Sequence, residues 1–113
     1  MAVYVSNITI PAGEDFEQVF ILENLITNSS FDLSNYEIYS SLKKHSESLN
    51  TTATFDVEIL DELLGIVQIS LASSITSEIR PGRYSYDILI NNGGVKKRAV
   101  EGSALVTGGV TKI

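Results

Sequence analysis

The stretch that decides the fold is residues 80–95, which read RPGRYSYDILINNGGV. Beyond its Pro-Gly pair, aromatic and aliphatic residues stand at every second position, which is the side-chain period of a β-strand. The stretch ends in Asn91-Asn92-Gly93-Gly94, and Asn and Gly tolerate the positive φ that a tight hairpin turn needs. We therefore expect a long strand, a turn, and an antiparallel partner strand over residues 95–106.

The same two-fold spacing recurs on the N-terminal side of this stretch. It predicts strands over residues 3–10 (in short pieces), 16–22, 36–43, 54–59 and 65–71. Short strands at such spacing, with turns of hairpin length between them, favour a sandwich over an α/β fold. We expect an all-β chain, an antiparallel, immunoglobulin-like β-sandwich of seven to eight strands, with residues 1–113 forming one domain.

Three segments carry finer expectations. Residues 19–22 (VFIL) are apolar without interruption, which is typical of a strand with apolar neighbours on both faces. Residues 44–52 are polar and predict an exposed hairpin loop. Gly102 lies inside the last strand and predicts a β-bulge, because glycine in a strand interior often marks one.

The alternation breaks at residues 72–79, where we expect the only helix. The residues predict one short helical turn near residues 73–79, with Ser73 or Ser74 as N-cap and Ile75 and Ile79 four positions apart. The Pro-Gly pair then precedes Tyr84. Immunoglobulin-like sandwiches place a tyrosine at such a corner, with its hydroxyl bonded to the upstream backbone. The alternative is that Tyr84 and Tyr86 are ordinary strand aromatics.

Composition narrows the classes of partner. The formal net charge is −6, and an acidic surface repels phosphate backbones and anionic membranes, so we expect no nucleic-acid or membrane partner. There is no cysteine, so disulfides and thiolate metal sites are excluded. The first residues lack the basic and apolar regions of a secretory signal, and we expect a protein that is not secreted.

No group of residues satisfies the requirements of a catalytic or metal site. His45 is the single histidine and lies in the polar loop. The chain has no Gly-x-Ser-x-Gly motif, which could supply a serine nucleophile for this histidine to activate. The acidic pairs Glu14-Asp15 and Asp61-Glu62 fall in turns and lack the alternating spacing of an EF-hand. We expect no catalytic, cofactor-binding or metal-ligating residue, no cofactor and no enzyme activity. The run at 96–98 (KKR) alternates between sheet faces, which predicts a positive edge that discourages strand pairing. The alternative is an edge that forms ion pairs with an acidic neighbour.

Five segments together resemble the small β-domains encoded among the structural genes of tailed bacteriophages. They are residues 10–16 (IPAGEDF), 31–36 (FDLSNY), 69–76 (ISLASSIT), 80–88 (RPGRYSYDI) and 98–106 (RAVEGSALV), followed by Val110-Thr111. The chain departs from that pattern where Ser70 precedes Leu71 and where Lys43-Lys44 replaces a more regular arginine. The pattern describes strands and turns and carries no functional residue.

This resemblance implies a virion structural protein of the tail, baseplate, neck or capsid surface, similar to the N-terminal attachment domain of a baseplate upper protein. The partners it implies are other virion proteins or further copies of the chain. Because sandwich edges can pair with neighbours, the interface candidates are the chain ends, at Val3, Tyr4, Val5, Val110 and Ile113. The alternative is a stand-alone carbohydrate-binding or adhesion sandwich, which would bind a glycan on a concave face with two or three exposed tyrosines.

Overall fold

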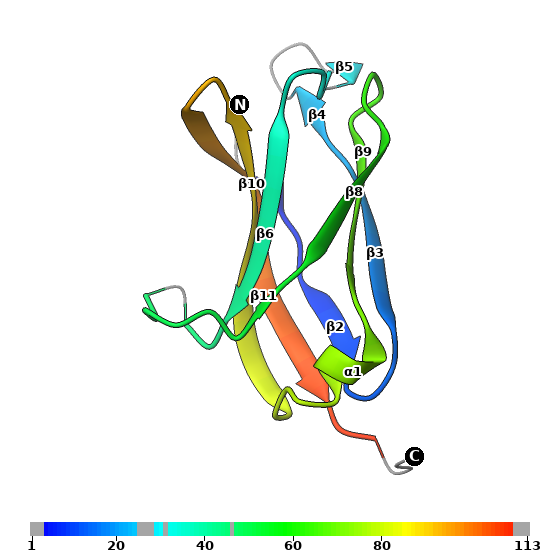
Figure 1. Ribbon diagram of the computed structural model, residues 1–113, viewed down its shortest axis with the longest axis vertical. Coiled ribbons are helices and arrows are strands. Elements are labelled where there is room, and N and C mark those ends of the chain that lie inside the picture. Colours follow the sequence, from blue (N-terminus) through cyan, green and yellow to red (C-terminus); the bar gives the residue numbers. More distant parts are fainter. Residues whose placement is uncertain (1–3, 25–28, 31, 46, 110–113) are drawn as a thin grey trace.

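Two β-sheets face each other in this chain, with the hydrophobic core between them (Figure 1). The structure, a computed structural model, describes residues 4–24, 29–30, 32–45 and 47–109. The larger sheet has six strands: β1 (Tyr4–Val5), β2 (Ile8–Pro11), β6 (Glu37–Lys43), β7 (Ala53–Thr54), β10 (Gly82–Asn92) and β11 (Val95–Thr107). The smaller sheet has three: β3 (Phe16–Ile21), β8 (Asp56–Asp61) and β9 (Ile66–Leu71). A separate pair joins β4 (Glu23–Asn24) and β5 (Ser29–Ser30).

The order of strands is β1-β11-β10-β6-β7 in the six-stranded sheet and β3-β9-β8 in the three-stranded sheet. β2 pairs with the same strand, β11, as β1 does, and both of these pairs are parallel. The other pairs are antiparallel. The expected all-β, immunoglobulin-like sandwich is therefore confirmed, with parallel pairing confined to the N-terminal strands.

Two-fold alternation places the core residues as expected. Along β10 the buried side chains are Tyr84, Tyr86, Ile88 and Ile90. Along β9 they are Val67, Ile69 and Leu71. Aromatic rings link the sheets, because Phe55 lies 6.0 Å from Phe16 and 6.3 Å from Tyr86 between ring centroids. The inner face of each sheet thus packs against the other.

The hairpin at residues 91–94 is confirmed. β10 and β11 pair from Gly82 opposite Val106 to Asn92 opposite Val95, which leaves Gly93 and Gly94 as the loop. Their φ angles are 60° and 90°, and residues other than Gly and Asn rarely adopt such positive values.

The tyrosine corner is also confirmed. The hydroxyl of Tyr84 donates a hydrogen bond of 2.7 Å to the carbonyl oxygen of Arg80, and the ring is buried. Tyr86 is the second buried tyrosine of the strand, and its hydroxyl donates to the Ser6 carbonyl oxygen at 2.6 Å. The two tyrosines therefore fasten different segments, the corner before β10 and the N-terminal crossing.

The expected strand over residues 54–59 is wrong in one respect, because the chain changes sheets inside it. β7 ends at Thr54 in the six-stranded sheet, and β8 begins at Asp56 in the three-stranded sheet. Phe55 lies at the switch, where its N–H donates to the Ser40 carbonyl oxygen at 2.9 Å and its ring enters the core. The two-fold pattern gave no sign of the switch, because the Phe55 side chain enters the core as it would from an unbroken strand.

The helical turn is shorter than expected and is capped differently. α1 spans Ser73–Thr76, its N-cap residue is Ala72, and no side chain of the cap residue bonds to the helix. A distant carboxylate does so instead: Asp15 Oδ1 accepts the N–H of Ser73 at 2.7 Å. The expected serine cap is therefore wrong, because a side chain from the β2–β3 turn supplies the acceptor.

Gly102 does not form a bulge. It pairs regularly with Tyr86, and the irregularity in this ladder lies between Ile88 and Leu89, opposite Ala99. A Cβ on Gly102 would lie 1.9 Å from the Ser6 carbonyl oxygen. The glycine is required because the N-terminal backbone crosses β11 at that point.

Candidate interaction surfaces

The turn carboxylates serve the backbone of the chain. Asp61 Oδ1 accepts the N–H groups of Leu63 and Leu64, both at 3.1 Å. Asp32 accepts the N–H of Ser34 at 2.9 Å, and hydrogen bonds from the Ser34 side chain and backbone hold the pKa of Asp32 below its ordinary value. These carboxylates therefore close local turns, as short acidic side chains commonly do.

Neither a metal-binding cluster nor a membrane-spanning helix is present in the part of the chain that the structure describes. Within those residues, no cluster of three or more His, Cys, Asp or Glu side chains is placed to hold a metal ion. Over the same residues, no helix is long and apolar enough to cross a membrane.

The interface candidates at the chain ends are only partly visible. Val3, Val110 and Ile113 lie outside the described residues. Tyr4 and Val5 form β1, which pairs with Val100 and Glu101 at the edge of the six-stranded sheet. The Val5 side chain is 69% exposed on that edge strand, and this keeps it as a candidate contact residue.

A polar groove of about 770 Å³ crosses the outer face of the six-stranded sheet. Its lining includes Ser41, Lys43, Ser85, Asp87, Arg98 and Glu101. Arg98 Nε lies 3.1 Å from Asp87 Oδ2, and Arg98 Nη1 lies 3.7 Å from Glu101 Oε2. This three-residue ion-pair cluster joins β10 to β11 across the floor of the groove.

The outer face of the three-stranded sheet is apolar at one end. Val19 and Ile21 of β3 are 45% and 61% exposed, although their neighbours Phe20 and Leu22 are buried. Leu63 and Leu64, in the β8–β9 turn, are also exposed. The turn lies beside the end of β3, because the Leu22 N–H donates to the Gly65 carbonyl oxygen at 2.8 Å. We call Val19, Ile21, Leu63 and Leu64 the apolar outer patch.

The run at residues 19–22 thus has apolar neighbours on one face only. The sequence indicated apolar neighbours on both faces, and within the described chain the outer neighbour is missing. The expectation is wrong for the single chain. Apolar side chains do lie on both sides of β3, but those on the outer side are exposed.

The loop between β6 and β7 leaves the body of the sandwich (Figure 1), as the polar composition of residues 44–52 predicted. Leu49 in this loop is 98% exposed. Sequence reasoning grouped it with the polar residues around it. A single exposed leucine is common on protein surfaces and does not by itself mark a contact.

One tyrosine has an unusual partner on the outer face of the six-stranded sheet. The Tyr39 hydroxyl donates a hydrogen bond to the Glu37 carboxylate, and the ring is 50% exposed. That hydrogen bond, and then the negative charge of Glu37, raise the pKa of Tyr39 above its ordinary value. The two residues lie two positions apart on β6.

Comparison with known proteins gives structural likeness alone. No protein-family model matches the chain, and no curated protein sequence does so. InlP of Listeria monocytogenes is similar in structure, at 12% identity and a TM-score of 0.51, over 90% of this chain and 26% of that one. This chain therefore spans about a quarter of that protein, and the likeness at this identity concerns the fold alone.

Two further structures are more distant. They are a family 123 glycoside hydrolase from Clostridium perfringens (15% identity, TM-score 0.42, 97% of this chain and 24% of that one) and the extracellular fragment of novel immune-type receptor 11 from Ictalurus punctatus (11% identity, TM-score 0.41, 100% and 91%). The three proteins differ in kind, and what the chain shares with the first of them is a sandwich architecture.

Proposed function

We propose that the chain is a structural module of a phage virion, in the tail, baseplate, neck or capsid surface, and that it acts through protein–protein assembly. The observation that carries the assembly role is the apolar outer patch. Ile21, on the outer side of β3, is 61% exposed, and Leu63, in the adjoining β8–β9 turn, is 64% exposed. Adjacent exposed apolar side chains in a chain with net charge −6 mark a contact surface.

The virion setting rests on the resemblance to phage structural β-domains described above. Its motifs coincide with elements that organise the sandwich. Residues 80–88 contain the tyrosine corner, and residues 10–16 contain the turn whose Asp15 caps α1. In this chain the matching residues therefore stabilise the sandwich, and fold does not itself dictate function.

The carbohydrate-binding alternative is supported by the polar groove on the six-stranded sheet. A glycan site also needs aromatic platforms, since sugar rings bind against flat apolar faces. Tyr84 and Tyr86 are buried, and among the described side chains Tyr39 is the most accessible tyrosine ring. Its hydroxyl is engaged by Glu37. Assembly therefore has the stronger support.

The experiment that tests the proposed function is the detection of the chain in phage particles. Particles are purified on a density gradient from the phage that encodes the chain, and then analysed by mass spectrometry and by immunogold labelling. We expect the chain at a defined copy number and at one location in the particle. Particles that lack the chain would overturn the proposal. Glycan-array binding by the isolated chain would favour the alternative.

A further inference from the structure

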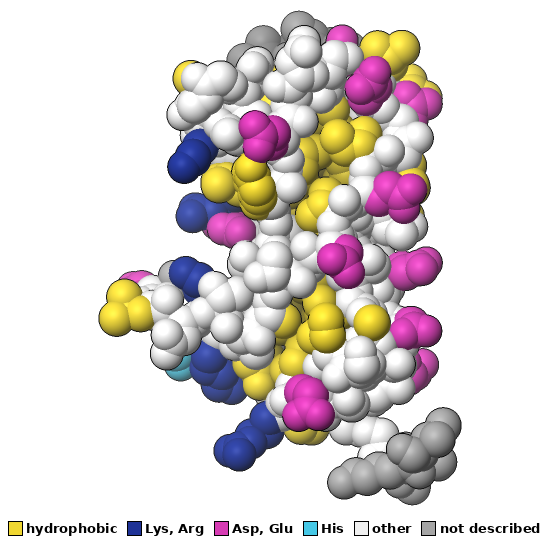
Figure 2. Space-filling view, in the orientation of Figure 1, with side chains coloured by type: hydrophobic (Ala, Val, Ile, Leu, Met, Phe, Trp, Pro, Cys, Tyr) yellow, Lys and Arg dark blue, Asp and Glu magenta, His cyan; other side chains and the backbone are white. Residues whose placement is uncertain are grey.

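The charges are divided unevenly between the two sheets. The strands of the three-stranded sheet carry acidic residues and no lysine or arginine: Glu17, Asp56, Glu58 and Asp61. Every lysine and arginine among the described residues belongs to the six-stranded sheet or to a loop that adjoins one of its strands: Lys43, Lys44, Arg80, Arg83, Lys96, Lys97 and Arg98. In Figure 2 the dark blue side chains lie on one side of the molecule, and magenta is most frequent along the other, with a few magenta side chains among the dark blue.

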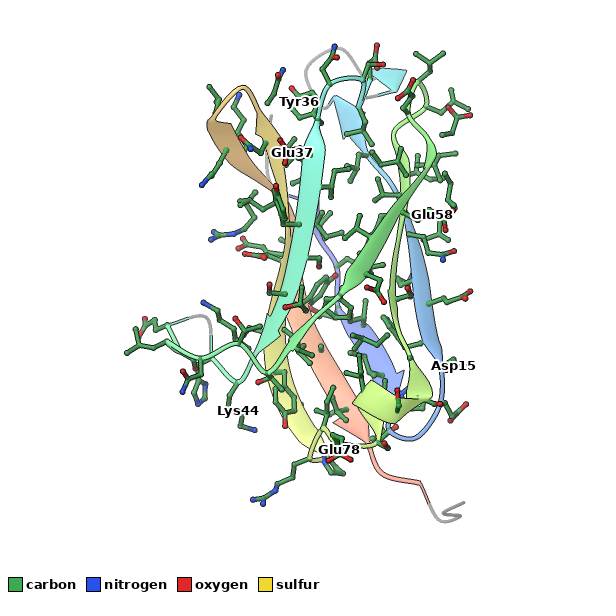
Figure 3. The ribbon with its side chains drawn as sticks, viewed as in Figure 1. Asp15, Tyr36, Glu37, Lys44, Glu58 and Glu78 are labelled. Atoms are coloured by element: carbon green, nitrogen blue, oxygen red, sulfur yellow. The ribbon has the colours of Figure 1, made fainter. Side chains whose placement is uncertain are left out.

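The strand register confirms that these charges point outward. Glu17 and Asp56 both pair with Ser70, and Glu58 pairs with Gln68, on the side of the sheet away from the core. On the other sheet, Arg83 pairs with Leu105 and Lys96 with Asn91, again on the outer side. Figure 3 shows Glu58 and Lys44 on opposite sides of the sandwich. One outer face is therefore acidic, and the opposite face carries the cations.

The acidic residues of the six-stranded sheet reduce this contrast only in part. Asp87 and Glu101 are paired with Arg98 within the same chain, and Glu37, the third acidic residue of these strands, accepts the Tyr39 hydroxyl. Arg83 and Lys96 are exposed and take part in no ion pair among the described residues. They remain available to an acidic partner.

We propose that a second copy of this chain is the partner of the apolar outer patch, and that copies associate front to back. The outer face of the three-stranded sheet of one copy contacts the outer face of the six-stranded sheet of the next. This inference rests on the proposed function, because it names the partner in assembly. Opposite charges on the two faces of one molecule are complementary only in this arrangement.

A two-fold symmetric dimer would oppose the charge pattern. It would bring each face against its own copy, and would place Glu17 and Glu58 of one molecule against the same acidic residues of the other. Like charges in contact disfavour association. A front-to-back contact is heterologous, and repeated contacts of that kind close into a ring or extend into a filament.

Apolar side chains on both faces add to the charge complementarity. The apolar outer patch contributes Val19 and Ile21, and the opposite face contributes Val5 and Leu105, which are 69% and 42% exposed. Interfaces commonly combine a central apolar area with a charged rim. The two faces supply these parts from the same chain.

Charge-reversal variants test the arrangement. The first variant carries Arg83→Glu and Lys96→Glu, the second carries Glu17→Lys and Glu58→Lys, and the third carries all four changes. All of these side chains are exposed, so the fold should be retained, and circular dichroism with thermal unfolding checks it. Mass in solution is measured by light scattering on a size-exclusion column over a range of protein and salt concentrations.

We expect the wild-type chain to associate beyond a dimer in a concentration-dependent way, and less so in high salt. Each double variant alone should associate about tenfold or more weakly, because attraction has become repulsion. An equimolar mixture of the two should regain association beyond a one-to-one complex, because the intact acidic and basic faces attract each other and so do the two reversed faces. The chain with all four changes should regain self-association.

Three results would overturn the inference: a wild-type chain that stays monomeric at every concentration, double variants that associate like the wild type, or a mixture that forms no complex. These outcomes are distinguishable from failure of the proposed function. A monomeric chain that is present in purified particles refutes self-docking alone. A chain that self-associates in the expected manner but is absent from particles refutes the virion role alone.

Discussion

The hydroxyl of Tyr84 lies 2.7 Å from the carbonyl oxygen of Arg80, four residues earlier in the chain. The bond joins the start of β10 to the corner that follows α1, where the chain passes from the three-stranded sheet to the six-stranded sheet. The Lys44 ammonium lies 4.7 Å from the centre of the same ring. Tyr84 thus fixes the crossover between the sheets by both its hydroxyl and its ring.

Replacing Tyr84 with Phe should lower the free energy of unfolding by about 1–2 kcal/mol, because the Arg80 carbonyl loses a buried partner. Urea unfolding followed by circular dichroism measures the change. The control is Tyr39→Phe, which removes a hydroxyl that bonds at the surface, and its effect should be smaller. Equal effects for the two variants would contradict a special role for the corner.

Thr76 is fully buried and links α1 to the β2–β3 turn. Its hydroxyl donates to the Glu14 carbonyl oxygen at 2.7 Å and accepts the Gly13 N–H at 3.1 Å. Thr76→Val keeps the shape and leaves both backbone groups unpaired, so we expect a loss of about 1–3 kcal/mol in unfolding free energy. Thr9→Val, at an exposed strand position, is the matched control and should change stability little. Similar stability of the two variants would show that water replaces the hydroxyl.

The sequence was sufficient for the parts of the fold that depend on local pattern. Strand alternation, the Gly93-Gly94 turn and the tyrosine corner each follow from neighbouring residues. The sheet switch at Phe55, the Asp15 cap of α1 and the contact between Gly102 and Ser6 depend on segments that meet only in the folded chain. No local pattern contains them, because each joins residues far apart in sequence or in different sheets.

The interaction surfaces show the same division. The two-sided apolar character of β3 was visible in the sequence, but the sequence could not show which face would remain uncovered. The charge division was also hidden, since Lys96 and Glu58 acquire opposite positions only when the two sheets are stacked. The interface residues were instead predicted at the two ends of the chain, because the position of a residue along the sequence is known without the tertiary structure.

Gly102→Ala should disturb the N-terminal crossing. A Cβ at this position would lie 1.9 Å from the Ser6 carbonyl oxygen and 2.7 Å from its carbon, so the backbone of β1 or β11 must move. We expect faster hydrogen exchange at the Ser6 N–H, which is bonded to the Glu101 carbonyl oxygen. Gly108→Ala is the control, because its Cβ would meet only the Pro81 side chain, at 3.3 Å. Unchanged exchange in Gly102→Ala would refute the steric argument.

The Tyr39–Glu37 pair predicts a shifted titration. The pKa of Tyr39 in the folded chain is raised above its ordinary value of 10.0. The pair therefore stabilises the fold at pH values below the pKa of Tyr39 in the unfolded chain. That contribution is lost as the pH rises through the folded value. Glu37→Gln removes the negative charge, and the phenolate absorbance at 295 nm should then appear at lower pH. Tyr39→Phe identifies the transition by its absence. An identical titration curve for Glu37→Gln would exclude the coupling.

Ile21 on β3 and Leu22 directly after it allow the effect of core packing on stability to be measured separately from the effect of the outer surface on self-association. Ile21 is 61% exposed, whereas Leu22 is only 4% exposed. Leu22→Ala should cost about 2–5 kcal/mol of unfolding free energy, because it opens a cavity in the core. Ile21→Ala should change stability by less than about 0.5 kcal/mol, as surface substitutions usually do. If the apolar outer patch is an interface, Ile21→Ala should nevertheless reduce the mass measured by light scattering at a given protein concentration. A wild-type mass distribution in this stable variant would show that β3 lies outside the contact.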